Sequence, residues 1–170
     1  METNVIYNEE CLSGIKKLED KSIDLVLTSP PYNIIQPNHK DRGYDLYNDG
    51  MSNEEYVDFT INLFKEFDRV LKPNGVVLYN MSYGNENPEC MLDTMYNIKS
   101  NTNFMVADTI VWKKRTAMPN VGSSNKLTRV CEFVYVCCRR DEYNTFKANK
   151  KIWSPDSFVF LQDDLKPCIP

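Results

Sequence analysis

Apolar and polar positions follow two different spacings along this chain, and these spacings predict its main strands and helices. Residues 23–28 form a short apolar run, typical of a buried strand. From Ser52 onward, apolar side chains recur every three or four positions, which predicts an amphipathic helix ending near residues 72–75. Ser52 and Glu55 have the spacing of a capping box. The apolar run 76–80 predicts the next buried strand.

The N-terminal region predicts a strand–helix–strand unit. Residues 5–7 are expected to form a short strand, and Asn8 is expected to cap the helix that follows. An apolar stripe extends that helix to about Leu18. Together with the strand at 23–28, this makes a β-α-β unit whose two strands run parallel.

The C-terminal half predicts one more helix and two more strands. Pro88 suits the first turn of a helix that extends to about residue 99. The runs 104–112 and 130–138 are expected to be strands, the second with Glu132 embedded among apolar residues. The chain is therefore expected to be an α/β protein.

The strand at 23–28 runs into a stiff loop, which is the main candidate for chemistry. Pro30 and Pro31 lack backbone N–H groups, so no ladder of hydrogen bonds can continue through them. Each proline also restricts the residue before it to an extended conformation. The loop therefore presents Ser29, the Pro30 carbonyl and the ring of Tyr32 at the carboxyl end of a strand, where open α/β sheets bind ligands.

The sequence Ser29-Pro30-Pro31-Tyr32 resembles the catalytic motif of the DNA amino-methyltransferases, which methylate cytosine N4 or adenine N6. That motif is Asp, Asn or Ser followed by Pro-Pro and an aromatic residue. Serine in the first place is more similar to the cytosine-N4 enzymes. The helix, the LKPNG turn and the strand that follow also resemble this family, so the resemblance covers about residues 4–138.

The resemblance implies a Rossmann-like methyltransferase sheet that is mostly parallel with one antiparallel strand. In this family the strands corresponding to 104–112 and 130–138 form a hairpin. Residues 1–140 would form the catalytic unit. Residues 141–170 show no regular period and are expected to be irregular, or to begin a target-recognition region.

The resemblance also implies roles for the residues of the motif, with Ser29, Pro30, Pro31 and Tyr32 forming the catalytic site. Tyr32 would stack on a base extruded from the DNA duplex. The Ser29 side chain and the Pro30 carbonyl would accept hydrogen bonds from the exocyclic amine of that base. S-adenosylmethionine would donate the methyl group.

Cofactor contacts are implied at two places. Glu10 and Cys11 stand where this family carries an Asp-Cys pair, whose acid contacts S-adenosylmethionine. An equally good interpretation of Glu10 is an acid in the first turn of a helix. Ser29 and Pro30 are expected to border the cofactor from the catalytic loop.

The Gly-rich loop of this family's cofactor pocket is missing from the sequence. The chain has six glycines, and no two of them form a G-x-G pair. In members whose catalytic motif comes first, that loop lies nearer the C-terminus. We therefore expect an incomplete sheet, with an empty slot between the strands at 5–7 and 23–28. A second polypeptide or a homo-oligomer is the expected partner that completes it. Two alternatives stay open: the chain could be a truncated fragment, or the N-terminal strand could shift and pair directly with the strand at 23–28.

Charge is distributed unevenly, and this distribution predicts contacts with DNA phosphates. Residues 113–151 hold ten Lys or Arg against three acids, although the whole chain has a net charge of −4. A solvated basic face is an equally good interpretation of this charge alone. The long polar loop 33–51 could also reach DNA. The residues expected to contact DNA are Asn33, His39, Lys40, Arg42, Lys113, Lys114, Arg115, Arg129, Arg139 and Arg140.

Composition argues against several other classes of protein. The six cysteines contain no C-x-x-C pair and His39 is the only histidine, so no metal site is expected. No apolar run approaches the length of a membrane span, and the N-terminus lacks the features of a signal peptide. We therefore expect a cytoplasmic protein without membrane contact.

Three alternatives to a cytosine-N4 enzyme stay open at this point. The chain could be an adenine-N6 DNA methyltransferase. It could be a non-catalytic or split subunit that needs a second chain to bind the cofactor. It could also methylate RNA or a protein glutamine, although the glutamine enzymes usually carry Asn where this chain has Ser29.

Overall fold

The computed structural model describes residues 4–33, 50–83, 87–117 and 127–144. The elements are, in chain order, α1 (Cys11–Ile15), β1 (Ile23–Thr28), α2 (Asn53–Val70), β2 (Leu71–Met81), α3 (Cys90–Asn101), β3 (Phe104–Lys113), β4 (Cys131–Arg139) and a 3-10 turn (Arg140–Glu142). The alternation of strands and helices confirms the predicted α/β class.

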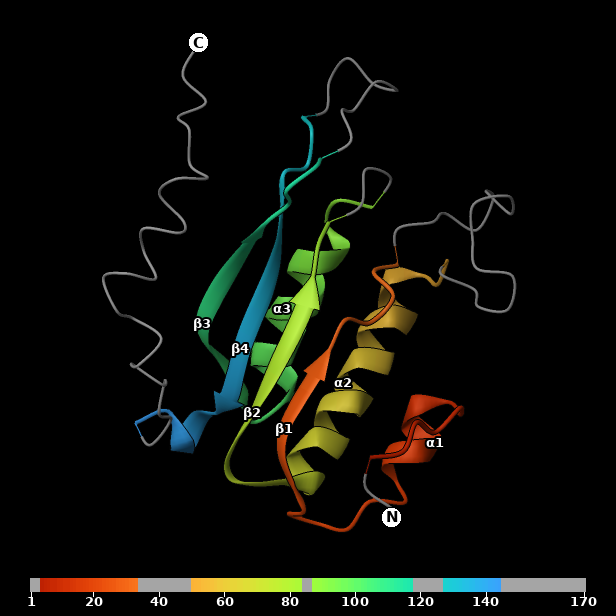
Figure 1. Ribbon diagram of the computed structural model, residues 1–170, viewed down its shortest axis with the longest axis vertical. Coiled ribbons are helices and arrows are strands. Elements are labelled where there is room, and N and C mark those ends of the chain that lie inside the picture. The colour runs from red at the N-terminus through yellow and green to blue at the C-terminus, as the bar shows by residue number, and fades with distance from the viewer. Residues whose placement is uncertain (1–3, 34–49, 84–86, 118–126, 145–170) are drawn as a thin grey trace.

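The four strands form one sheet in the order β1-β2-β4-β3 (Figure 1). β1 pairs with β2 in parallel, and β4 is antiparallel to both of its neighbours, β2 and β3. The strands β1, β2 and β3 therefore run in one direction and only β4 is reversed. This confirms the expected sheet, which is mostly parallel with one antiparallel strand.

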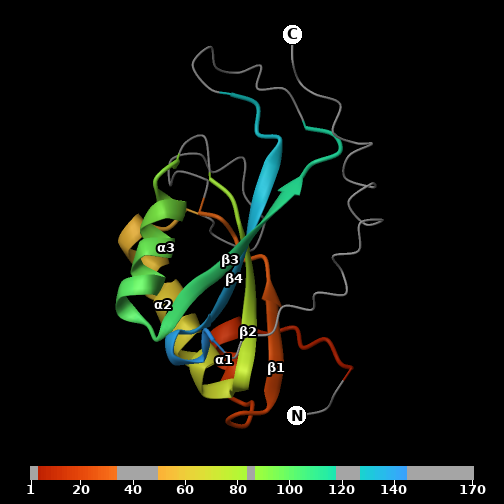
Figure 2. The same ribbon diagram turned by 90° about the vertical axis from the view of Figure 1, so that its left-hand side faces the viewer.

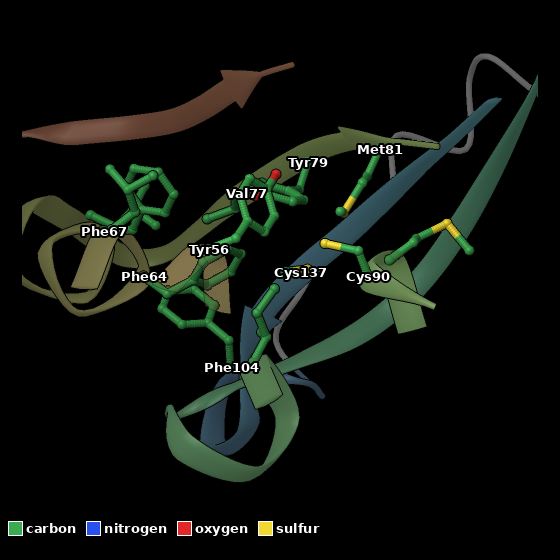
Figure 3. Packing of buried hydrophobic residues seen from close by; sticks show 13 residues of the cluster. Tyr56, Phe64, Phe67, Val77, Tyr79, Met81, Cys90, Phe104 and Cys137 are labelled. Atoms are coloured by element: carbon green, nitrogen blue, oxygen red, sulfur yellow. The ribbon is translucent and has the colours of Figure 1, made fainter. Parts of the chain in front are cut away.

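Helices α2 and α3 both cover the same face of the sheet (Figure 2). The core lies between this helical layer and the sheet (Figure 3). Phe64 of α2 is its centre, because the Phe64 ring meets the rings of Phe67, Tyr79 and Phe104 edge-on at centroid distances of 5.3–5.4 Å. The predicted apolar stripe of α2 is thus confirmed as core.

Helix α2 begins with the predicted capping box. The Ser52 hydroxyl accepts the backbone N–H of Glu55 at 3.2 Å, and the Glu55 carboxylate accepts the backbone N–H of Ser52 at 2.9 Å. The helix ends at Val70, and β2 begins directly at Leu71 rather than at residue 76. Strand pairing starts this early because Leu71 lies opposite Ile23, before the register of the two strands shifts.

The predicted N-terminal strand at residues 5–7 is wrong. These residues lie outside the sheet, and Ile6 is 97% exposed. Three apolar residues need a neighbouring strand in order to pair, and no described residue offers one beyond β1. The predicted cap of α1 is also wrong, because the cap is Glu10 and not Asn8.

Strands β3 and β4 lie within one residue of their predicted bounds. Helix α3 begins later than predicted, at Cys90, so Pro88 precedes it. Residues 145–170 lie outside the described residues. The expectation that this segment is irregular or begins a target-recognition region therefore stays a prediction. Within the described ranges, the helices are too short or too polar to cross a membrane.

Candidate active site

The loop after β1 leaves the sheet at its carboxyl end, as predicted. Ser29 is exposed and Pro30 is buried beneath it. The loop is held from below by α2, because the hydroxyl of the buried Tyr56 donates to the Pro31 carbonyl at 2.5 Å. A proline pair that is anchored through its own carbonyl presents Ser29 and Tyr32 on a rigid support.

The end of the neighbouring strand β2 supplies Asn80. Thr28 pairs with Tyr79, so the next residue on each strand, Ser29 and Asn80, are also brought together. The Ser29 hydroxyl donates to Asn80 Oδ1 at 3.1 Å, and this oxygen also accepts the Tyr32 hydroxyl. The Asn80 amide is fixed in turn, because its Nδ2 donates to the Phe133 carbonyl at 3.1 Å.

Strand β4 supplies a carboxylate, Glu132, to the same group. The Tyr32 hydroxyl lies 3.1 Å from Glu132 Oε2, and Lys114 Nζ lies 2.6 Å from Glu132 Oε1. Burial raises the pKa of Glu132, but the hydrogen bonds and charge of Lys114 and the Tyr32 hydroxyl outweigh it, so the net pKa is lowered. Glu132 is therefore ionised at neutral pH.

Asn33, which is predicted to contact DNA, is buried beside Met51. It is 1% exposed, and its side-chain amide is bound to the backbone of Met51. Its own carbonyl accepts a hydrogen bond from the Asn87 side chain at 2.9 Å. The sequence placed Asn33 in a polar loop, but its side chain is buried and bound to Met51. His39, Lys40 and Arg42 lie outside the described residues.

Four of the predicted basic residues lie at the same end of the sheet as Ser29. β3 runs parallel to β1, so Lys113 at its carboxyl end and the following Lys114 and Arg115 extend toward that end (Figure 1). The Arg129 guanidinium lies 5.0 Å from the centre of the Tyr83 ring and also donates to the Tyr83 carbonyl.

The other two described basic residues that are predicted to contact DNA lie at the opposite end of the sheet from Ser29. β4 is antiparallel, so the chain has returned to the amino end of β1 when it reaches Arg139 and Arg140 (Figure 1). The Arg139 side chain is only 10% exposed. Its guanidinium is held by Asp68, Glu142 and the carbonyls of Asp68, Leu71 and Lys72. The Arg140 guanidinium donates to the carbonyls of Lys99 in α3 and Phe104 in β3.

The two residues expected to contact the cofactor differ in their surroundings. The Glu10 carboxylate accepts the backbone N–H groups of Leu12 and Ser13, both at 2.8 Å. These bonds lower its pKa, the Leu12 bond most of all, and they support the interpretation of Glu10 as a helix-capping acid. Cys11 lines a groove of about 800 Å³ together with Leu25 and Leu27 of β1.

These residues fit only one wall of a pocket for S-adenosylmethionine. The groove along β1 and the exposed Ser29 are present, but the sequence offers no G-x-G loop to approach the cofactor closely.

Three residues of the site were not predicted to belong to it. Asn80 was identifiable as a polar residue at the carboxyl end of a predicted buried strand. Glu132 was identifiable as a charge inside an apolar run, which is costly unless the charge is paired. Tyr56 gave no such signal, because an aromatic residue in an apolar helical stripe is ordinary core.

Comparisons with known proteins point to the DNA methylases. The family model described as DNA methylase matches residues 23–157. The Type II methyltransferase M.HinfI of Haemophilus influenzae is 27% identical over 161 residues, which cover 87% of this chain and 41% of that protein. M.BglII of Bacillus subtilis is 35% identical over 78 residues, which cover 46% of this chain and 19% of that protein. The chain thus spans less than half the length of these relatives.

Solved structures share the fold. PvuII DNA methyltransferase (cytosine-N4-specific) matches with a TM-score of 0.60 at 18% identity, over 77% of this chain and 47% of that one. TTHA0409 of Thermus thermophilus, solved with S-adenosyl-L-methionine, matches with a TM-score of 0.52 at 16% identity. The match covers 91% of this chain and 70% of that one. At these identities the likeness shows the fold alone.

Proposed function

This chain belongs to the DNA methylase family of N6/N4 amino-methyltransferases, and from that premise we propose that it moves a methyl group from S-adenosylmethionine to an exocyclic amine of a DNA base. One observation carries the proposal. The Ser29-Pro30-Pro31-Tyr32 loop stands at the carboxyl end of β1 with Ser29 exposed, and both side chains that carry a hydroxyl are bound to Asn80.

The residues of the loop have two tasks in this proposal. The Tyr32 ring stacks on the target base, which must leave the duplex because its amine is otherwise buried in the stack. The Ser29 oxygen and the Pro30 carbonyl accept hydrogen bonds from the two N–H groups of the amine. These bonds draw the nitrogen lone pair out of conjugation with the ring, and this orientation is the main catalytic contribution of the loop.

S-adenosylmethionine supplies an electrophilic methyl group when it is bound. The chain need not supply a strong base, since the amine becomes acidic once the new N–C bond forms and can then release a proton. Ser29, which is a weak base, suffices as a hydrogen-bond acceptor. The proposal therefore needs no covalent intermediate between the protein and the base.

We propose cytosine N4 as the target atom. One observation supports this over adenine N6: the first residue of the motif is Ser29, which is more similar to the cytosine-N4 enzymes. The test is nucleoside mass spectrometry of DNA methylated in the presence of the chain and its completing partner. N4-methylcytosine is expected. Detection of N6-methyladenine alone would assign the chain to adenine, and unmodified DNA under all conditions would overturn the enzymatic proposal.

We further propose that another polypeptide segment, from this chain or from a second one, completes the sheet along β1. The described part of the chain offers no strand on the open side of β1, where Leu25 and Leu27 are 49% and 70% exposed. An apolar strand with an open edge favours a partner. The same observation favours the second candidate function, that of a split methyltransferase subunit which binds its cofactor only with that partner.

A further inference from the structure

Glu132 is a charged residue within an otherwise apolar strand. Its neighbours along β4 are apolar from Cys131 to Cys138, and its side chain is only 14% exposed. Removing a carboxylate from water is costly unless its oxygens are paired. Both oxygens have partners here, namely Lys114 at Oε1 and the Tyr32 hydroxyl at Oε2.

The Tyr32 hydroxyl is the link between this carboxylate and the catalytic loop. It lies 3.1 Å from Glu132 Oε2, 3.1 Å from Ser29 Oγ, and within hydrogen-bonding distance of Asn80 Oδ1. A phenol has one proton to donate. The acceptor that takes this proton therefore decides which lone pairs of the neighbouring oxygens remain available.

The Tyr32 hydroxyl can donate to Glu132, to Asn80 or to Ser29 Oγ, since in the contact with Ser29 either oxygen can be the donor. Asn80 Oδ1 has two lone pairs, so it accepts the Ser29 hydroxyl at 3.1 Å in either case. If Tyr32 donated to Ser29 Oγ, it would occupy a lone pair that could otherwise accept the amine of a base. If Tyr32 donates to Glu132, both lone pairs of Ser29 stay free. An ionised carboxylate is the strongest of the three acceptors.

We propose that Glu132 is a positioning residue, which takes the Tyr32 proton and thereby keeps both lone pairs of the Ser29 hydroxyl free to accept, while Asn80 orients that hydroxyl. This role rests on the proposed function for its catalytic value, but the hydrogen-bond arrangement itself does not. Lys114 serves the arrangement by binding the other oxygen of the carboxylate. It also explains why an acid and a base from two strands meet beside the loop.

The test combines a spectroscopic measurement with kinetics on the full chain and its completing partner. The Tyr32 ring signal is assigned in a [13C]tyrosine spectrum by its loss in Tyr32→Phe. Glu132→Gln keeps the size of the side chain but removes the charge, so the Tyr32 signal should move. In methylation assays Glu132→Gln should lower kcat about tenfold, the loss expected for one hydrogen bond, with little change in KM for DNA.

The double variant gives the sharpest result. With Tyr32→Phe there is no phenol proton to place, so adding Glu132→Gln should cause no further loss of kcat. The matched control is Asp108→Asn, which neutralises an exposed carboxylate on β3 and should leave the Tyr32 signal and kcat unchanged. If Glu132→Gln fails to fold, Glu132→Asp replaces it, because the shorter side chain keeps the charge but loses the reach.

Two outcomes would overturn the positioning role. One is a Tyr32 signal that does not move in Glu132→Gln. The other is a full additional loss of kcat in the double variant. A preparation that methylates no DNA but shows the Tyr32 shift would refute the proposed function and would support the hydrogen-bond arrangement, so the two failures are distinguishable.

Discussion

The side-chain amide of Asn33 spans both backbone polar groups of Met51. Asn33 Oδ1 accepts the Met51 N–H at 2.8 Å, and Asn33 Nδ2 donates to the Met51 carbonyl at 3.0 Å. Asn33 directly follows the catalytic loop, and Met51 directly precedes the N-cap of α2. This pair therefore fixes the end of the loop to the helix that supports it.

Replacing Asn33 should loosen the loop. Asn33 has φ of 52°, which glycine adopts without strain, so Asn33→Gly removes the side-chain bonds alone. We expect this variant to lose about 1–3 kcal/mol of unfolding free energy, because the Met51 groups lose their partner. Asn33→Ala should lose more, since alanine is strained at this φ. Urea unfolding monitored by circular dichroism measures both, and equal stability of the glycine variant and the unaltered chain would contradict the role of the pair.

Replacing Ser29 or the half-buried Tyr32 should impair catalysis. Tyr32→Ala removes stacking worth about 1–3 kcal/mol, so binding of the target base should weaken by about tenfold or more. Ser29→Ala should slow methyl transfer while DNA binding stays nearly unchanged. Rates of methyl incorporation at saturating DNA and cofactor check both effects. Full rates in both variants would rule out the assignment of the loop.

Arg139 should matter for stability and not for DNA binding. Its guanidinium binds the carboxylates of Asp68 and Glu142 and three backbone carbonyls where α2 ends and β2 begins. The side chain is only 10% exposed. Arg139→Met should cost about 3 kcal/mol, because it leaves these acceptors unpaired. Arg115→Met is the control and should change stability by less than about 0.5 kcal/mol, because Arg115 is exposed. Thermal unfolding of the two variants makes the comparison.

Lys113 and Arg115 should contribute to the salt dependence of DNA binding. Both are exposed at the end of the sheet that carries Ser29. If both contact phosphates, neutralising them together should reduce the slope of log K against log salt by about 1–2. Arg140→Gln, at the opposite end, should leave the slope unchanged. A slope altered by Arg140→Gln and not by the double variant would place DNA at the other end of the sheet.

The open edge of β1 should make the isolated 170-residue chain self-associate and bind S-adenosylmethionine weakly. Charges introduced by Leu25→Lys and Leu27→Lys should suppress that association, because charged side chains protect strand edges. Leu92→Lys is the matched control, because Leu92 is exposed to a similar degree, at 63%, but lies on α3. Analytical ultracentrifugation and calorimetry provide the measurements. Tight one-to-one cofactor binding by a monomer would show that the chain builds its pocket without a partner.

The sequence by itself determined most of the elements and the position of the Ser29–Tyr32 loop. Periodicity is a local property, so the apolar stripe of α2, its capping box and the strand that ends just before the Pro30-Pro31 pair could be predicted from neighbouring residues alone. The strand at residues 5–7 could not, because a three-residue apolar run becomes a strand only if a partner strand lies beside it.

The tertiary structure decided which residues meet at the loop. Asn80 reaches Tyr32 because β2 pairs with β1, and Glu132 reaches it because β4 inserts beside β2. Pairing across a sheet depends on register that no local spacing reveals. The reversed direction of β4 likewise carries Arg139 to the far end of the sheet, although in sequence it belongs to the same basic segment as Lys113. Local pattern sets what each segment becomes, whereas strand order and direction set which side chains become neighbours.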